Sequence, residues 1–168
     1  KGIVTQRDYN DVDGLITNCK GITLVTQFAD CVPLLFYDPE KQVIATSHAG
    51  WRGTVQEIGR KTVEKMAEVF GCNPKNILAA IGPSIGKCCY EVDDPVVDGF
   101  KPLSYIPKDD ILTAKANGKY MLDLQTANRL ILEHAGIPNG NICVSDLCTC
   151  CNSHYFHSHR ATNGSRGN

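Results

Sequence analysis

The sequence carries almost no net charge and contains no long apolar run. Its 168 residues include 17 Lys and Arg against 18 Asp and Glu, a formal net charge of −1. This balance gives no electrostatic signature of binding to nucleic acid or to an anionic membrane, so neither partner is expected. No stretch approaches the roughly 18 consecutive apolar residues of a transmembrane helix. Length and a hydrophobic share of 42% instead fit one globular domain over residues 1–168.

Cysteine is present but does not indicate a disulfide scaffold. The nine cysteines are an odd number, so they cannot all pair within the chain. Four of them form two adjacent pairs, Cys88 with Cys89 and Cys150 with Cys151. Adjacent cysteines rarely bridge each other, so we expect free thiols and a cytoplasmic location. The first residues show no signal-peptide pattern.

Short β-like runs alternate with two helical patterns, which predicts a mixed α/β (α+β) fold. Turn residues separate apolar or β-branched runs and predict five strands, over Ile22–Thr26, Val32–Tyr37, Val43–Thr46, Ile77–Ile81 and Asn141–Val144. A capping box beginning at Thr54 predicts a first helix that ends at Gly71. A second helix is expected from an Asp123 cap to Gly136.

The densest chemical signal lies between a predicted strand and the first helix, in Ser47-His48-Ala-Gly-Trp-Arg-Gly53. A strand-to-helix junction presents free backbone N–H groups and the positive end of a helix, which together attract anions. Gly50 and Gly53 would let a ligand approach the backbone, and Arg52 offers a bidentate partner for phosphate or carboxylate. The pattern therefore predicts an anion site. The alternative is a simple turn with Arg52 in solvent.

A second candidate side chain is Cys31, which directly precedes the predicted strand that begins at Val32. His48 lies at the end of the next predicted strand, so the thiol and the imidazole are expected to approach each other. A thiolate and an imidazole suit zinc ligation or a nucleophile and base pair. A catalytic zinc usually takes three protein ligands, so two are not enough. The alternative is a small buried cysteine and a hydrogen-bonded histidine.

The C-terminal segment holds further metal-binding side chains whose roles the sequence leaves open. Cys148, Cys150, Cys151 and His154 lie within seven positions, without the paired spacing typical of structural zinc modules.

The loop that begins after Ile81 is rich in glycine. Its sequence, Gly-Pro-Ser-Ile-Gly86, matches neither a Walker loop nor a dinucleotide fingerprint, so a tight turn is expected. The following Cys88-Cys89-Tyr90 is expected in the core.

Taken together, the motifs resemble a bacterial family first labelled multicopper polyphenol oxidase or laccase-domain proteins and later described as purine nucleoside phosphorylases. The motifs are Ala-Asp-Cys31-Val-Pro, His48-Ala-Gly-Trp-Arg-Gly53, Ile81-Gly-Pro-Ser-Ile-Gly-Lys-Cys-Cys-Tyr-Glu-Val92, and Asp146-Leu-Cys-Thr149 followed by Phe156-His-Ser-His-Arg160. The resemblance covers nearly the whole chain. It implies a single α/β domain of mixed sheets packed together with helices outside, similar to a cysteine-hydrolase-like toxin domain.

The resemblance also implies an activity and a metal. The expected reaction is phosphorolysis of adenosine, inosine and methylthioadenosine, with adenosine deamination as a companion activity. The family's zinc is held by two His and one Cys, and the motifs match Cys31 and His48 to two of these ligands. The other His is expected before Lys1, because the family's usual length implies that its N-terminal third and a short final strand are absent here.

The same resemblance assigns roles around the metal. Phosphate is expected at Gly50, Arg52 and Gly53, with Arg52 also acting in catalysis, while Arg160 and His159 are candidates for lining the pocket. The general acid, the preferred nucleoside and the oligomeric state are not predicted.

Three other functions remain open at this point. The first is a copper-dependent polyphenol oxidase, although five His and two Met are few for a multicopper relay. The second is a hydrolase with Cys31 as nucleophile and His48 as base. The third is a binding domain whose site is vestigial.

Overall fold

The predicted mixed α/β fold is confirmed by a computed structural model, which describes residues 12–165. Within these residues the order of elements is β1 (Gly14–Thr17), β2 (Val32–Asp38), β3 (Val43–Ala49), α1 (Trp51–Val55), α2 (Ile58–Phe70), η1 (Pro74–Asn76), β4 (Leu78–Ile81), β5 (Glu91–Val92), α3 (Asp94–Gly99), α4 (Lys108–Ile111), β6 (Leu112–Ala114), β7 (Tyr120–Leu122), α5 (Leu124–His134), η2 (Asn139–Asn141) and β8 (Ile142–Val144).

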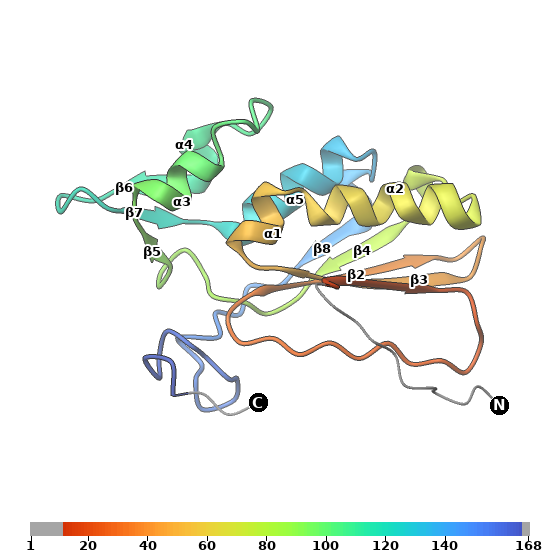
Figure 1. The fold of residues 1–168 in the computed structure, drawn as a ribbon, viewed down its shortest axis with the longest axis horizontal. Coiled ribbons are helices and arrows are strands. Elements are labelled where there is room, and N and C mark those ends of the chain that lie inside the picture. Colours follow the sequence, from red (N-terminus) through yellow and green to blue (C-terminus); the bar gives the residue numbers. More distant parts are fainter. Residues whose placement is uncertain (1–11, 166–168) are drawn as a thin grey trace.

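The strands form two sheets of different size. The large sheet has the order β1-β3-β2-β4-β8, and its only parallel pair in the described part of the chain is β4 with β8. The small sheet, β5-β7-β6, is antiparallel. Helices α1, α2 and α5 cover one face of the large sheet, while α3 and α4 lie with the small sheet at one end (Figure 1).

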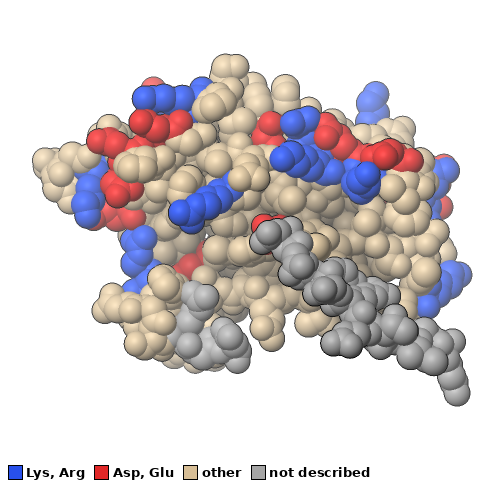
Figure 2. Space-filling model, in the orientation of Figure 1, with Lys and Arg blue, Asp and Glu red and all other residues tan. Residues whose placement is uncertain are grey.

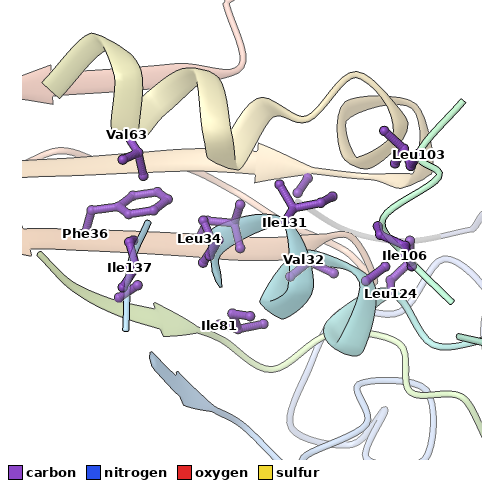
Figure 3. Close-up of a cluster of buried hydrophobic side chains, with 14 of the residues drawn as sticks. Val32, Leu34, Phe36, Val63, Ile81, Leu103, Ile106, Leu124, Ile131 and Ile137 are labelled. Carbon is purple, nitrogen blue, oxygen red and sulfur yellow. The ribbon is translucent and has the colours of Figure 1, made fainter. Parts of the chain in front are cut away.

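The core lies between the large sheet and its covering helices. Along β2, Val32, Leu34 and Phe36 are buried, whereas the alternate residues Leu35 and Tyr37 are exposed. This alternation is expected of a strand with one covered face. Figure 3 shows the buried side chains of β2 meeting residues of α2 and α5, among them Val63 and Ile131, together with Ile81 of β4.

Strand β3 is covered on both faces, because the segment between β1 and β2 runs along the face opposite the helices (Figure 1). On that face Thr46 is buried, while Ile44 and His48 are half-buried. On the helix side, the hydroxyl of Ser47 meets that of Thr62 in α2 at 2.6 Å. On the other side, the hydroxyl of Thr46 meets that of Thr26 at 3.1 Å. The predicted strand at Ile22–Thr26 is therefore wrong: this segment covers the sheet without joining it.

The helix ends show which local signals hold. Gly71 closes α2 with a left-handed φ of 66°, as predicted. The Asp123 side chain caps α5 by accepting a hydrogen bond from the Thr126 N–H, also as predicted. The capping box at Thr54 is wrong, because α1 already begins at Trp51, and the buried Thr54 hydroxyl donates to the Gly50 carbonyl at 2.9 Å.

The surface fits the balanced composition. Acidic and basic side chains are interspersed on the face seen in Figure 2. In the described part of the chain, no helix has the length and apolarity needed to cross a membrane.

Candidate functional site

A pocket of about 390 Å³ opens where β2 begins and β3 ends. Since these strands are antiparallel neighbours, with Val32 opposite Ala49, the residues just before β2 and just after β3 lie side by side. The predicted site residues all line this pocket: Cys31, His48, Gly50, Arg52, Gly53, His159 and Arg160. Residues within 31–53 and residues 159–160, which are more than a hundred positions apart in the sequence, therefore line one cavity.

The thiol of Cys31 and the imidazole of His48 both lie beside Gly50 in the pocket. The interaction with Cys31, together with a weaker contribution from Asp13, raises the pKa of His48 to about 9, although partial burial acts in the opposite direction. The sequence placed both residues at strand ends, and the structure places them in the same pocket. Such a pair suits a metal or a nucleophile with its base.

Asp13 orients the imidazole from behind and was missed by the sequence analysis. Its Oδ1 lies 3.0 Å from Nδ1 of His48, and its carbonyl accepts the His48 backbone N–H at 2.8 Å. This leaves Nε2 toward Cys31. Asp13 directly precedes β1, whose pairing with β3 positions it, and a four-residue strand has too little pattern to be predicted.

At two glycines of the pocket, Gly50 and Gly53, the backbone lies very close to Cys31 and His48. A Cβ added at Gly50 would lie 3.0 Å from the Cys31 thiol sulfur and 4.0 Å from Nε2 of His48. A Cβ at Gly53 would lie 3.0 Å from the His48 carbonyl oxygen. Side chains at either position would therefore press on the Cys31–His48 pair.

Arg52 carries the positive charge on one side of the pocket. It is exposed, and its guanidinium carbon lies 4.5 Å from the centre of the Trp51 ring, a cation–π arrangement. The predicted anion cradle at a long helix beginning at Thr54 needs correction. The helix that begins after Gly50 has five residues, so its dipole is small and the guanidinium is the main anion-attracting group.

Arg160 lies on the other side of the pocket and is held by backbone oxygens. Its Nη1 donates to the Cys89 carbonyl and its Nη2 to the Glu91 carbonyl, each at 3.1 Å. Its guanidinium carbon is 5.4 Å from the centre of the Tyr90 ring, which also lines the pocket. The expectation that Cys88-Cys89-Tyr90 lies in the core is therefore wrong, since Cys88 is exposed and Tyr90 faces the cavity.

Asp30 ties together the segments that line the pocket. It is buried and has a left-handed φ of 75°. Its Oδ1 accepts a hydrogen bond from the Thr149 hydroxyl at 2.6 Å, and its Oδ2 accepts one from the Arg160 N–H at 2.7 Å. Its carbonyl accepts the Ile85 N–H at 2.9 Å. Nothing local in the sequence distinguishes this aspartate, because its partners are more than fifty positions away.

Next to the pocket, four thiols converge. The sulfurs of Cys88, Cys89, Cys148 and Cys151 all lie within 4.8 Å of one another, close enough to hold a metal ion. We call them the four-cysteine cluster. Of the C-terminal side chains singled out in the sequence, Cys148 and Cys151 join it, whereas Cys150 and His154 do not.

The Cys31–His48 pair fits part of a zinc site. A carboxylate behind the imidazole, as Asp13 provides, is the usual arrangement behind a metal-bound histidine. Within residues 12–165, the only group of three or more converging candidate ligands is the four-cysteine cluster, so this pair supplies two ligands. A zinc here would need a further ligand, and it would supply a bound water of lowered pKa and an electrophile.

Comparison with known proteins identifies the family of the chain. The family model described as multi-copper polyphenol oxidoreductase laccase matches residues 2–168. The chain is 46% identical over 155 residues to a protein of Bacillus subtilis named purine nucleoside phosphorylase YlmD, covering 92% of this chain and 55% of that protein. It is 42% identical over 149 residues to adenosine deaminase RL5 of an unknown prokaryotic organism, covering 89% of this chain and 56% of that protein.

A solved structure shares the fold. The crystal structure of YlmD from Geobacillus stearothermophilus matches with a TM-score of 0.88 at 44% sequence identity, covering 93% of this chain and 58% of that one. The present chain thus spans a little over half the length of these relatives. A family match over nearly every residue, with the same fold, shows that the chain belongs to the multi-copper polyphenol oxidoreductase laccase family.

Proposed function

We propose that this chain carries the reaction site of a zinc-dependent purine nucleoside phosphorylase, with adenosine deamination as a companion activity. The observation that carries the proposal is the single pocket in which the Cys31–His48 pair meets Arg52 and Arg160. A volume of about 390 Å³ is that of a small-molecule site. The names of relatives more than 40% identical, a phosphorylase and a deaminase, point to nucleosides as the molecules.

In phosphorolysis, a phosphate oxygen forms a bond to C1′ of the ribose while the bond from C1′ to the purine nitrogen breaks. The products are ribose 1-phosphate and the free base, which takes up a proton. The protein must hold the phosphate against the ribose and favour departure of the base.

We assign phosphate binding to Arg52, with Gly50 and Gly53 allowing phosphate to approach the backbone. A guanidinium binds phosphate through two parallel hydrogen bonds. Arg160 contributes positive charge on the opposite side, although the carbonyls of Cys89 and Glu91 hold its Nη1 and Nη2. The main role of Arg160 is therefore to hold the wall of the pocket in place, and direct binding of the anion is secondary.

We assign the metal to Cys31 and His48, with Asp13 orienting the ring. Deamination needs a water activated by a metal, which a zinc held by this pair would supply. Copper fits less well, because His48 and His159 are the only histidines lining the pocket in the described part of the chain. A multicopper oxidase needs several histidines for its copper centres.

A second candidate function is a hydrolase with Cys31 as nucleophile and His48 as base, favoured by the place of both side chains beside Gly50 in the pocket. The two functions differ in their need for phosphate. We would incubate the full-length protein that contains residues 1–168 with inosine, with and without phosphate, and identify the sugar product.

The proposal predicts that hypoxanthine forms only with phosphate and that the sugar appears as ribose 1-phosphate. Equal hypoxanthine formation without phosphate, with free ribose as product, would favour the hydrolase. Absence of any product under both conditions, from folded and metal-loaded protein, would favour a binding domain.

A further inference from the structure

We propose that the four-cysteine cluster is a structural zinc site, separate from the Cys31–His48 pair. Its ligands are Cys88 and Cys89 from the loop after β4 and Cys148 and Cys151 from the segment after β8. The cluster joins two stretches of chain that lie about sixty positions apart.

The distances between the sulfurs fit a tetrahedral site. Four sulfurs at the usual zinc–sulfur distance of about 2.3 Å lie about 3.8 Å from each other. In the cluster, the Cys88 and Cys151 sulfurs are 3.6 Å apart, the Cys89 and Cys151 sulfurs 3.4 Å, and all four lie within 4.8 Å. A small contraction or expansion around an ion is all that coordination requires.

The ligand type also identifies the metal class. Four thiolates in a tetrahedron select zinc or iron over the hard cations magnesium and calcium. The C-terminal segment lacks a second Cys-x-x-Cys pair, as the sequence analysis noted, but Cys148 and Cys151 have this spacing between them. The other two ligands are the adjacent Cys88 and Cys89.

Disulfide bonds explain the cluster less well. A disulfide brings two sulfurs to about 2.05 Å and orients its cysteines in pairs. All four cysteines are free thiols in the structure, and Cys151 lies within 3.6 Å of both Cys88 and Cys89 and so is not placed toward a single partner.

The surroundings of the cluster are built for thiolates. The backbone N–H of Gly86 donates to the Cys148 sulfur at 3.2 Å, the kind of bond that stabilises a metal-bound thiolate. A Cβ at Gly86 would lie 3.2 Å from Cβ of Cys148 and 3.3 Å from the Cys88 sulfur. Glycine at this position therefore lets the two segments come together.

The site would hold the wall of the reaction pocket in place. The Cys89 carbonyl accepts a hydrogen bond from Arg160, and Tyr90 directly follows in the pocket lining. Between the two ligands of the other segment, Thr149 donates to Asp30, the neighbour of Cys31. The zinc would thus link both segments to the pocket without taking part in the reaction.

Zinc content of the full-length protein tests the proposal. Variants distinguish zinc at the four-cysteine cluster from zinc at the Cys31–His48 pair. We would measure zinc per chain in Cys31→Ala, in Cys31→Ala combined with Cys151→Ser, and in Cys31→Ala combined with Cys150→Ser as the matched control. Cys150 adjoins Cys151 in the chain but lies outside the cluster.

We expect one zinc per chain in Cys31→Ala and in the Cys150→Ser control, and its loss in the Cys151→Ser combination. Equal zinc in all three proteins would overturn the proposal. Because a cluster variant can misfold, X-ray absorption of zinc in Cys31→Ala provides a second measurement. It should show four sulfurs at about 2.3 Å, and a shell containing nitrogen or oxygen would overturn the site. So would disulfides among these four cysteines in protein purified under reducing conditions. Bound iron in place of zinc would support metal binding by the cluster but overturn its assignment to zinc.

Discussion

The backbone N–H of Arg160 donates a 2.7 Å hydrogen bond to Oδ2 of Asp30, a residue 130 positions earlier in the chain. This bond fastens the C-terminal segment to the residue next to Cys31. Because Asp30 is buried, its carboxylate must keep such partners, and removing them would leave polar groups unsatisfied. The shape of the pocket thus depends on a long-range contact made by a side chain outside the reacting set.

Replacing Asp30 with Ala should therefore damage both stability and activity. Two hydrogen bonds to a carboxylate are lost and Ala adopts positive φ poorly, so we expect a loss of about 2–4 kcal/mol in the free energy of unfolding. Denaturant unfolding measures this loss. Asp38→Ala is the control, because Asp38 is equally buried and accepts two backbone N–H groups at 2.9 Å far from the pocket. Asp38→Ala should lose stability but keep its turnover, and equal turnover losses in the two variants would contradict this account.

A methyl group at position 50 should disturb the pocket with little effect on stability. Its Cβ would lie 3.0 Å from the Cys31 sulfur, so the sulfur must shift by a few tenths of an ångström beside His48. We expect Gly50→Ala to lower turnover by up to about 10-fold, because a misplacement on the order of 1 Å can cost about 100-fold and this shift is smaller. Gly140→Ala is the matched control, since a Cβ there meets nothing within 4 Å. Steady-state kinetics measure the turnover of both variants, and their melting temperatures measure stability. Wild-type turnover in Gly50→Ala would refute the prediction.

Removal of the Arg52 guanidinium should weaken phosphate binding. We expect Arg52→Ala to raise the KM for phosphate at least about 10-fold, equal to about 1.4 kcal/mol, with a smaller change in the KM for nucleoside. Arg52→Lys should recover only part of this loss, because an ammonium lacks the two-pronged geometry. Arg129→Ala, which breaks a half-buried ion pair with Glu133 on α5 outside the pocket, serves as control. An unchanged phosphate KM in Arg52→Ala would remove this residue from the phosphate site.

The carboxylate of Glu57 should make stability depend on pH. Although partial burial acts to raise it, hydrogen bonds from Arg60 and Tyr105 lower the pKa of Glu57 below the ordinary value of 4.5. A lowered folded pKa means that stabilisation is present above pH 4.5 and is lost as pH falls through the lower folded value. Glu57→Gln should thus cost roughly 1 kcal/mol at neutral pH. This difference from the wild-type protein should shrink in acid, and a constant difference from neutral to acid pH would argue against the assignment.

Local sequence signals predicted those elements whose ends and buried faces are set locally. β2 shows strict alternation, and both Gly71 and Asp123 end or begin a helix as expected. Thr54 failed as a helix cap because tertiary contacts decide its environment: its hydroxyl accepts from Asn128 of α5 at 3.0 Å. The run at Ile22–Thr26 has strand-like composition, but no strand within residues 12–165 pairs with it.

In the candidate site, too, features set by local sequence were predicted and features set by tertiary contacts were not. Cys31 and His48 could be brought together from the sequence because each lies at the end of a predicted strand, and those strands are neighbours. Asp13 and the four-cysteine cluster could not, because their partners come from distant segments that only the fold brings together. Chemistry-bearing residue types are visible in a sequence, whereas their long-range partners depend on topology.

The most direct test of the reaction site is the rate of phosphate-dependent inosine cleavage in the full-length protein with Cys31→Ala, compared with Cys143→Ala. Cys143 is an exposed thiol in β8 outside the pocket. If the Cys31–His48 pair is the reaction site, Cys31→Ala should lose about 100-fold or more in turnover, while Cys143→Ala keeps the wild-type rate. Equal rates in the two variants, from proteins of equal thermal stability, would contradict the central claim.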